Sequence, residues 1–266
     1  VVATLAESTW AKKMMPVLCH SLWIILLFLT ACAPIKGMSR HETVVDSITG
    51  ATEKSSLWSP CTRNQALVWE QQSEQDPGVA LQAARCYAVL ARNGTSKSIR
   101  LENAVNGRKM AEAAVALDPK NSTGHYLAAY LAGLEAENHT LKGLSLVSVI
   151  ERGAIEASRL KPELDHGGPD RMLGELYLRA PDPPVSIGDL EKAILHYQRA
   201  VMQDPDFVEN RLGLAEAYLE DEDPGPACDQ LQQILIRMPP ADGWEGQWRQ
   251  TLDLMKQLCE METQDN

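Results

Sequence analysis

The stretch DLEKAILHYQRAVMQDP, residues 189–205, decides the fold of this chain. Its small and apolar residues recur every three or four positions, which is the pattern of an amphipathic helix. A proline closes it, and a helix ends before a proline because the ring clashes with the preceding turn and lacks an N–H. Two earlier stretches close in the same way, AVALDP at 114–119 and ASRLKP at 157–162. We therefore expect one helical unit to recur along the chain.

Prolines mark this recurrence at nearly regular intervals. Pro77, Pro119, Pro162, Pro205 and Pro239 lie 42, 43, 43 and 34 residues apart. The last interval is the period of the tetratricopeptide repeat (TPR), a hairpin of two helices, A and B, that touch at small residues. The longer intervals predict the same hairpin with longer loops between its helices, because long surface loops are tolerated.

Each unit is expected to contribute one helix A and one helix B. The expected A helices span residues 80–92, 122–133, 168–180 and 208–220, and the B helices span 104–117, 146–160, 189–205 and 224–239. The inserted loops are expected at about 93–101, 134–143 and 180–188.

Further helices are expected at both ends of this array. One lies at about residues 61–74, and a C-terminal capping helix carries Trp244 and Trp248. Such caps cover the open apolar face of an end repeat. The predicted fold is therefore all-α: a right-handed superhelical solenoid of tetratricopeptide-like hairpins over residues 61–262. The alternative is a closed helical bundle in which the prolines are coincidental.

The N-terminal region has the features of a secretory signal. Lys12 and Lys13 precede the apolar run VLCHSLWIILLFL at 17–29, and Leu-Thr-Ala-Cys follows, ending at Cys32. The run is shorter than the roughly 20 apolar residues of a typical spanning helix. Leu-Thr-Ala-Cys resembles the bacterial lipobox, which implies cleavage before Cys32 and acylation of that residue. A cleaved secretory peptide with an incidental cysteine, or a retained anchor helix, is the alternative.

This interpretation divides the chain into three parts. Residues 1–31 are the lipoprotein signal peptide, residues 32–60 form a flexible polar tether, and residues 61–262 form the solenoid. Several acyl chains on Cys32 would anchor the protein firmly in a lipid bilayer. Ala33 after the cysteine favours the outer membrane over the inner one. The expected location is the cell envelope, lipid-anchored and facing the periplasm.

Composition limits the partners and the redox state. A net charge of −11 opposes binding to nucleic acid, so no nucleic-acid partner is expected. Besides Cys19 in the signal and the lipid-bearing cysteine, four cysteines remain, at 61, 86, 228 and 259. Pairing Cys61 with Cys86 and Cys228 with Cys259 would join neighbouring helices in an oxidising compartment. Sequence alone does not fix connectivity, and four buried thiols are the alternative.

No motif for catalysis or for metal or cofactor binding is present. No two cysteines have zinc-ligand spacing, and the six histidines are scattered without an H-E-x-x-H pair. Walker loops, dinucleotide fingerprints and nucleophile elbows are absent from the sequence. The chain is therefore expected not to be an enzyme and to need no cofactor or metal.

The candidate binding residues lie on the A helices, which line the concave side of such a solenoid. Repeat positions 5 and 9 point into this groove, and in the first repeat they hold Leu81 and Arg85. In the later repeats these positions hold Tyr126, Tyr130, Arg171, Glu175, Leu212 and Glu216. Tyrosine and arginine are over-represented at binding hot spots. The alternative is that Arg85 and an Arg171–Glu175 pair form ion pairs and that the tyrosines only stack.

The block GGPDRMLGELYLRAP at 167–181, followed by the helix pair at 187–219, resembles the TatT family, the T component of TRAP transporters. The residues that match the family motif are Gly167, Gly168, Arg171, Gly174 and Tyr177. The resemblance implies a periplasmic, lipid-anchored scaffold that binds the substrate-binding (P) component of a TRAP-type uptake system. It also implies a homotrimer and a small hydrophobic or organic-acid ligand in a groove or pore. The alternative function is a general envelope assembly lipoprotein built from tetratricopeptide repeats.

Overall fold

The computed structural model describes residues 57–139 and 142–237, together with residues 251, 253, 255 and 259. The expected signal peptide, Cys32 and most of the expected tether lie outside the described residues. Trp244 and Trp248 of the expected capping helix lie outside them too. The four described positions of that C-terminal segment are helical, and Met255 packs against α10 (Pro224–Arg237) and its neighbours.

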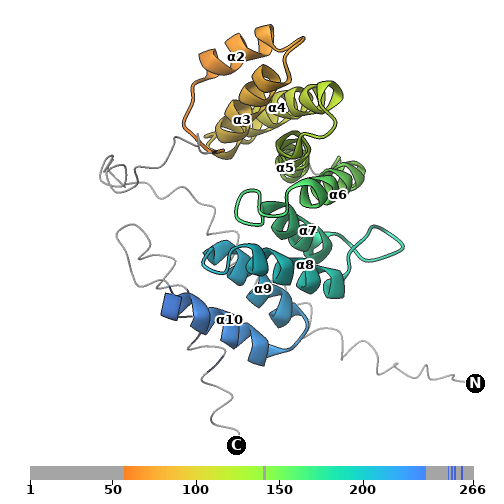
Figure 1. Ribbon diagram of the computed structural model, residues 1–266. Coiled ribbons are helices and arrows are strands. Elements are labelled where there is room, and N and C mark those ends of the chain that lie inside the picture. The colour runs from red at the N-terminus through yellow and green to blue at the C-terminus, as the bar shows by residue number, and fades with distance from the viewer. Residues whose placement is uncertain are drawn as a thin grey trace, which may run out of the picture. The chain divides into compact units, whose positions relative to one another are not determined.

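Helices make up the regular structure of the described residues, which contain no strand. In chain order they are α2 (Arg63–Gln72), α3 (Pro77–Arg92), α4 (Lys97–Leu117), α5 (Ser122–Asn138), α6 (Gly143–Leu160), α7 (Gly168–Arg179), α8 (Leu190–Gln203), α9 (Val208–Glu220) and α10. Each helix packs on the next, so that α3–α4, α5–α6, α7–α8 and α9–α10 form successive hairpins (Figure 1). The all-α stack of TPR-like hairpins is confirmed.

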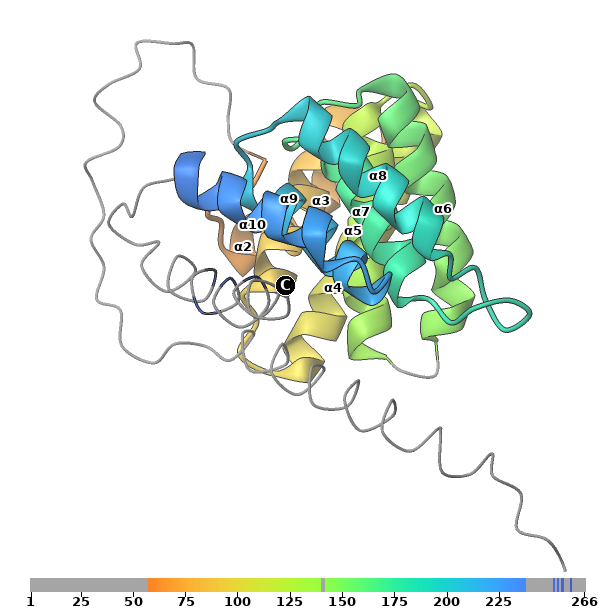
Figure 2. The ribbon, with the colours of Figure 1, turned by 90° about the horizontal axis from the view of Figure 1, so that it is seen from below.

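The first helices of the hairpins also form a series of their own. α3 contacts α5, α5 contacts α7, and α7 contacts α9. In Figure 2 these four helices lie toward the middle of the view, with α6 and α8 to one side. We call the surface made by α3, α5, α7 and α9 the A-helix face. It is the surface on which the sequence placed the candidate binding residues.

The prolines end helices by one repeated geometry. Asp118 caps α4 with φ −137° and ψ 87°, the extended conformation that a following proline imposes. The residues before the prolines at the ends of α6 and α8 have φ −155° and −145°. In each case the cap N–H donates to the carbonyl of a fully buried alanine, and these alanines are Ala114, Ala157 and Ala200. The recurring segments that run from a buried alanine to a proline therefore specify both a close contact between helices and the end of the helix.

Two of the three predicted loops are wrong. α4 begins at Lys97 and has 21 residues, so it takes in half of the loop expected at 93–101. α5 runs on to Asn138 through much of the loop expected at 134–143. The two extensions hold each other, because Arg100 Nε donates to Asn138 Oδ1 at 3.1 Å. Longer helices therefore account for the first long intervals, and only the segment between Arg179 and Leu190 is the loop that was expected.

Close approach between hairpins depends on small residues facing a tyrosine. Tyr197 of α8 is 2% exposed, and its ring lies between two glycines of neighbouring A helices. A Cβ on Gly174 of α7 would come within 2.7 Å of this ring, and a Cβ on Gly213 of α9 within 2.1 Å. A larger residue at Gly174 would push α7 away from α8 within one hairpin, and a larger residue at Gly213 would push the next hairpin away from α8.

Both disulfides that the sequence left open are present. Cys61 is bonded to Cys86 and ties the segment before α2 to α3. Cys228 is bonded to Cys259 and ties α10 to the C-terminal segment. The alternative of four free thiols is wrong.

We predict that Gly213→Ala lowers the free energy of unfolding by about 1–3 kcal/mol, because the added methyl overpacks the contact between Gly213 and the Tyr197 ring. Gly133→Ala is the matched control, since a Cβ there would meet nothing within 4 Å. In the interior of α5 it should raise stability by about 0.5–1 kcal/mol through helix propensity alone. Urea unfolding followed by circular dichroism measures the stability of both variants. Equal effects of the two substitutions would contradict the close packing of Gly213 against Tyr197.

Candidate functional site

A tight turn before α7 holds the most connected carboxylate of the A-helix face. Three consecutive residues adopt left-handed conformations, Asp165 (φ 50°), His166 (φ 59°) and Gly167 (φ 79°). Such angles are unfavourable for residues other than glycine, so the surrounding contacts must hold the turn. Asn210 Nδ2 of α9 donates to the His166 carbonyl at 2.8 Å, which supplies one of these contacts.

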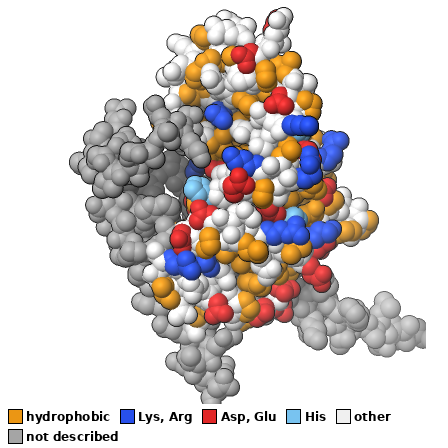
Figure 3. Space-filling view, viewed as in Figure 1, with side chains coloured by type: hydrophobic (Ala, Val, Ile, Leu, Met, Phe, Trp, Pro, Cys, Tyr) orange, Lys and Arg blue, Asp and Glu red, His pale blue; other side chains and the backbone are white. Residues whose placement is uncertain are grey.

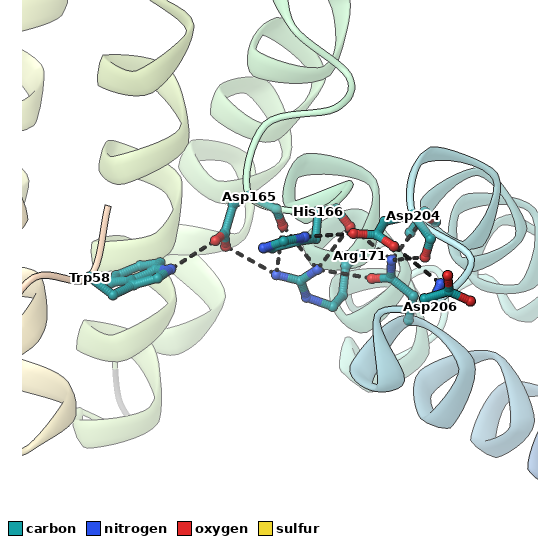
Figure 4. Close-up of polar contacts among 8 residues, drawn as sticks. Trp58, Asp165, His166, Arg171, Asp204 and Asp206 are labelled. Atoms are coloured by element: carbon teal, nitrogen blue, oxygen red, sulfur yellow. Dashed lines mark hydrogen bonds and ion pairs between the residues drawn. The ribbon is translucent and has the colours of Figure 1, made fainter. Parts of the chain in front are cut away.

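Asp165 accepts hydrogen bonds from three different parts of the chain, and Figure 4 shows Trp58 and Arg171 on either side of it. Trp58 Nε1 donates to Oδ1 at 2.8 Å, and the Tyr126 hydroxyl of α5 donates to Oδ2 at 2.6 Å. Arg171 of α7 donates to Oδ2 at 3.1 Å. Burial raises the pKa of Tyr126 well above its ordinary value, and the Asp165 charge raises it further. Tyr126 is therefore a neutral, buried hydrogen-bond donor.

Asp165, Tyr126, Arg171 and Asn210 form a polar junction between α5, α7 and α9, and Arg171 is held inside it. It donates to the carbonyls of Asp165 and His166 and, at 2.9 Å, to Asn210 Oδ1. Its guanidinium carbon also lies 4.7 Å from the centroid of the Phe207 ring. The Arg171–Glu175 ion pair, which was the alternative to a binding role, does not form, because Arg171 pairs with Asp165 instead. Arg171 thus joins α7 to α9 and to the preceding turn, and its donors are already used by the chain.

The next residue pair of the junction lies toward α8. His166 Nδ1 lies 2.6 Å from Asp204 Oδ2, and the His166 ring stacks on Phe207 at 4.4 Å (Figure 4). Burial alone would raise the pKa of Asp204, but the hydrogen bonds from His166 and from the N–H of Asp206 outweigh it and lower that pKa. Asp204 is therefore an ionised cap of the turn.

The chain covers part of its own A-helix face. We call residues 57–61 the N-terminal strap. Leu57 and Trp58 of the strap pack against the core between α3 and α5. The Trp58 ring lies 4.8 Å from that of Tyr130, which in turn lies 6.3 Å from that of Tyr126. Of the two tyrosines expected to face a partner, Tyr130 therefore contacts the strap directly, and Tyr126 is linked to it through Tyr130 and Asp165. The disulfide of Cys61 fastens the strap to α3.

Carboxylates gather on the part of the face that the described strap does not reach. Arg179 of α7 donates to Glu175 at 3.1 Å and to Glu216 of α9 at 2.6 Å. The Glu175 side chain is 53% exposed and also accepts from the Tyr197 hydroxyl. Burial and the nearby Glu175 charge raise the pKa of Glu137 at the end of α5. Arg179 thus pairs with two carboxylates, and Glu137 lies near Glu175 and Arg100. Three carboxylates against two arginines leave this group with a net negative charge.

Two further predicted site residues have their contacts away from this face. Tyr177 is buried, donates to Glu151 of α6 at 2.7 Å, and stacks on His196 of α8 at 5.5 Å. Leu212 is partly buried against the apolar core between α9 and α10. Both side chains are held in packing contacts between helices. The predicted set therefore separates into a junction around Asp165, an open acidic group and two packing residues.

Sequence reasoning missed Trp58, Asp165, Arg179 and Asn210. A polar pair before Gly-Gly signals a left-handed turn, and this signal could have pointed to Asp165. The contact of Trp58 with a residue 107 positions away has no local signal. On the side of the molecule seen in Figure 3, acidic and basic side chains alternate instead of forming a field of one sign.

The described residues contain neither a metal site nor a membrane-spanning helix. No group of three or more His, Cys, Asp or Glu side chains there is placed to hold a metal ion. Among the described helices, none has the length and apolar character needed to cross a membrane.

The fold of the chain is similar to that of a known TPR protein. No protein-family model matches the chain, and no curated protein matches it. Among solved structures, a thermophilic TPR protein from Thermus thermophilus is similar, with a TM-score of 0.50 and 18% sequence identity. The match covers 70% of this chain and 88% of that one. At this identity the likeness establishes the fold, a TPR-like stack of helical hairpins.

We predict that Arg171→Glu lowers the free energy of unfolding by about 3 kcal/mol, because it places a second carboxylate against the largely buried Asp165. Arg199→Glu on α8 is the control, since Arg199 is exposed and no ion pair of the described residues involves it. The control should change stability by less than about 0.5 kcal/mol. Thermal unfolding measures both, and an unchanged melting temperature for Arg171→Glu would refute the structural role.

Proposed function

We propose that this protein is a lipid-anchored scaffold that holds the substrate-binding component of a TRAP-type solute uptake system on the periplasmic side of the membrane. The observation that carries the interaction role is the TPR-like stack itself, whose A helices contact one another in series and form a continuous face. Repeat proteins of this kind use such extended surfaces to bind other proteins.

The choice of partner depends on the resemblance of residues 167–181 to the TatT family. In the structure this block builds the junction between hairpins. A Cβ on Gly168 would come within 2.6 Å of the Tyr126 hydroxyl, and Gly174 lies against Tyr197. Arg171 holds the turn at Asp165. On this proposal the motif residues keep the hairpins in the geometry that the partner recognises, and exposed side chains beside them make the contacts.

The open acidic group around Arg179 is the part of the face that we assign to the partner. Glu137, Glu175 and Glu216 come from three successive A helices, so a partner contacting them spans three hairpins. Rim charges of this kind steer association and set specificity more than they add affinity.

The anchor determines where the partner is held. With lipid on Cys32, about 25 residues separate the membrane from Leu57, and a flexible chain of that length has an end-to-end distance of about 25–30 Å. The scaffold would then keep a soluble binding protein within a few nanometres of the bilayer, which raises its effective concentration there. A homotrimer, as the resemblance implies, would present three such faces.

Affinity purification of the lipidated protein followed by mass spectrometry tests the partner. We predict recovery of a TRAP-type substrate-binding protein, with about threefold to tenfold less recovered by Glu137→Lys, because this change removes a rim charge. Stability should change little, since Glu175 would attract the new lysine and Arg100 would repel it. Asp229→Lys, at an exposed position of α10, is the matched control. Recovery of outer-membrane barrel assembly or peptidoglycan machinery instead would contradict the proposal and favour the envelope-assembly function.

The lipid anchor is tested by Cys32→Ala. We predict that this variant accumulates as unprocessed precursor or appears in the soluble fraction, because it lacks the acylated residue. Membrane fractionation and intact-mass measurement distinguish the two forms. An unchanged membrane fraction without acylation would contradict the lipobox assignment.

A further inference from the structure

Arg85 of α3 is an arginine without a partner on the A-helix face. In a chain with 36 acidic residues against 25 basic ones, no hydrogen bond or ion pair of the described residues involves it. Its Nε is enclosed and has no hydrogen-bond partner. Burial lowers the pKa of Arg85, and no neighbouring carboxylate offsets this effect. The two terminal nitrogens of Arg85 are not enclosed in this way and can bind a ligand, and partial removal of the guanidinium from water strengthens a charge-assisted hydrogen bond to it.

A second arginine without an ion pair among the described residues lies on the same side of α3. Arg85, Val89 and Arg92 follow one another at helical spacing, so they share a face over two turns, and about 10 Å separates the first from the last. The guanidinium of Arg92 lies over the Trp58 ring, 5.9 Å from its centroid. A cleft of about 250 Å³ opens here and is lined by Trp58, Val89, Arg92 and Asn93. The cleft itself thus combines one cation, Arg92, with the apolar side chains of Trp58 and Val89, and Arg85 lies two turns earlier along the same side of α3.

The spacing of the two arginines indicates the shape of the ligand. Guanidinium groups bind carboxylates through paired hydrogen bonds, which makes a carboxylate the natural partner of each. In an extended polyproline-type chain, residues three apart lie on the same side and about 9 Å from each other. Two glutamates at this separation match Arg85 and Arg92, and an apolar residue between them can rest on Val89 and Trp58.

We propose that Arg85, Val89 and Arg92, together with Trp58 of the strap, form a docking site for an extended acidic segment of a protein partner. This inference rests on the proposed scaffold function and adds the chemistry of one contact. The opposite charge of the group around Glu175 and Glu216 repels such a segment from the far end of the face. The charge pattern along the A helices therefore fixes where the acidic segment of the partner lies.

Fluorescence anisotropy with the purified full chain tests the site. The probe is a labelled peptide containing Glu-Pro-Leu-Glu, compared with Gln-Pro-Leu-Gln and with free glutarate. We expect Arg85→Gln to weaken binding of the glutamate peptide by about tenfold, the effect of losing a charge-assisted contact. Arg199→Gln, the same change at an exposed arginine of α8, should alter it by less than about twofold. Arg85→Gln should keep its melting temperature, because Arg85 has no partner among the described residues to lose.

Three outcomes would overturn the site: equal binding of the two peptides, no effect of Arg85→Gln, or binding of glutarate but not of the peptide. Capture experiments separate this from failure of the proposed function. If wild type and the Arg85→Gln and Arg92→Gln variants capture the TRAP component equally, the docking site is refuted and the scaffold function stands. If the peptide binds in an Arg85-dependent way but wild type captures no TRAP component, the partner assignment is refuted and the site stands.

Discussion

The fold depends on letting helix backbones approach closely at small residues and then ending each helix at a fixed point. Fully buried alanines such as Ala114, Ala157 and Ala200 serve both needs, because their small side chains admit the neighbouring helix and their carbonyls accept the last hydrogen bond before a proline. Tyr197 applies the same principle within the α7–α8 hairpin at Gly174 and between hairpins at Gly213, with one large ring filling the space that two glycines leave.

This packing leaves the polar chemistry at the junctions between hairpins. Asp165 gathers donors from the strap, from α5 and from α7, so a single carboxylate connects segments that are far apart in the chain. The charges of Asp165 and Arg171 compensate each other in a partly buried place, where loss of either partner would be costly. The residues most conspicuous as binding candidates in the sequence therefore hold the repeats in register.

The side chains that remain exposed for contacts with a partner are ones that the sequence pattern marked less clearly. The open carboxylates around Arg179 and the pair Arg85 and Arg92 lie at different places on the same series of helices, and they carry opposite charge. A protein ligand could be both positioned and oriented by such a surface, because misaligned binding would bring like charges together. The strap adds Trp58 to this surface, so the segment that leads to the tether is also part of the face.

Local sequence predicts the all-α class, the hairpin repeat, the helix ends and the small-residue contacts, because propensity, periodicity and proline geometry act within a few residues. It placed two loops wrongly, since the mutual hold of Arg100 and Asn138 extends two helices at once and has no local signature. Contacts between distant segments determine that Arg171 bonds Asp165 while Glu175 bonds Arg179, that both disulfides form, and that Trp58 reaches Tyr130. Each of these depends on which turns of different helices come to the same level, and that is set by packing across the whole stack.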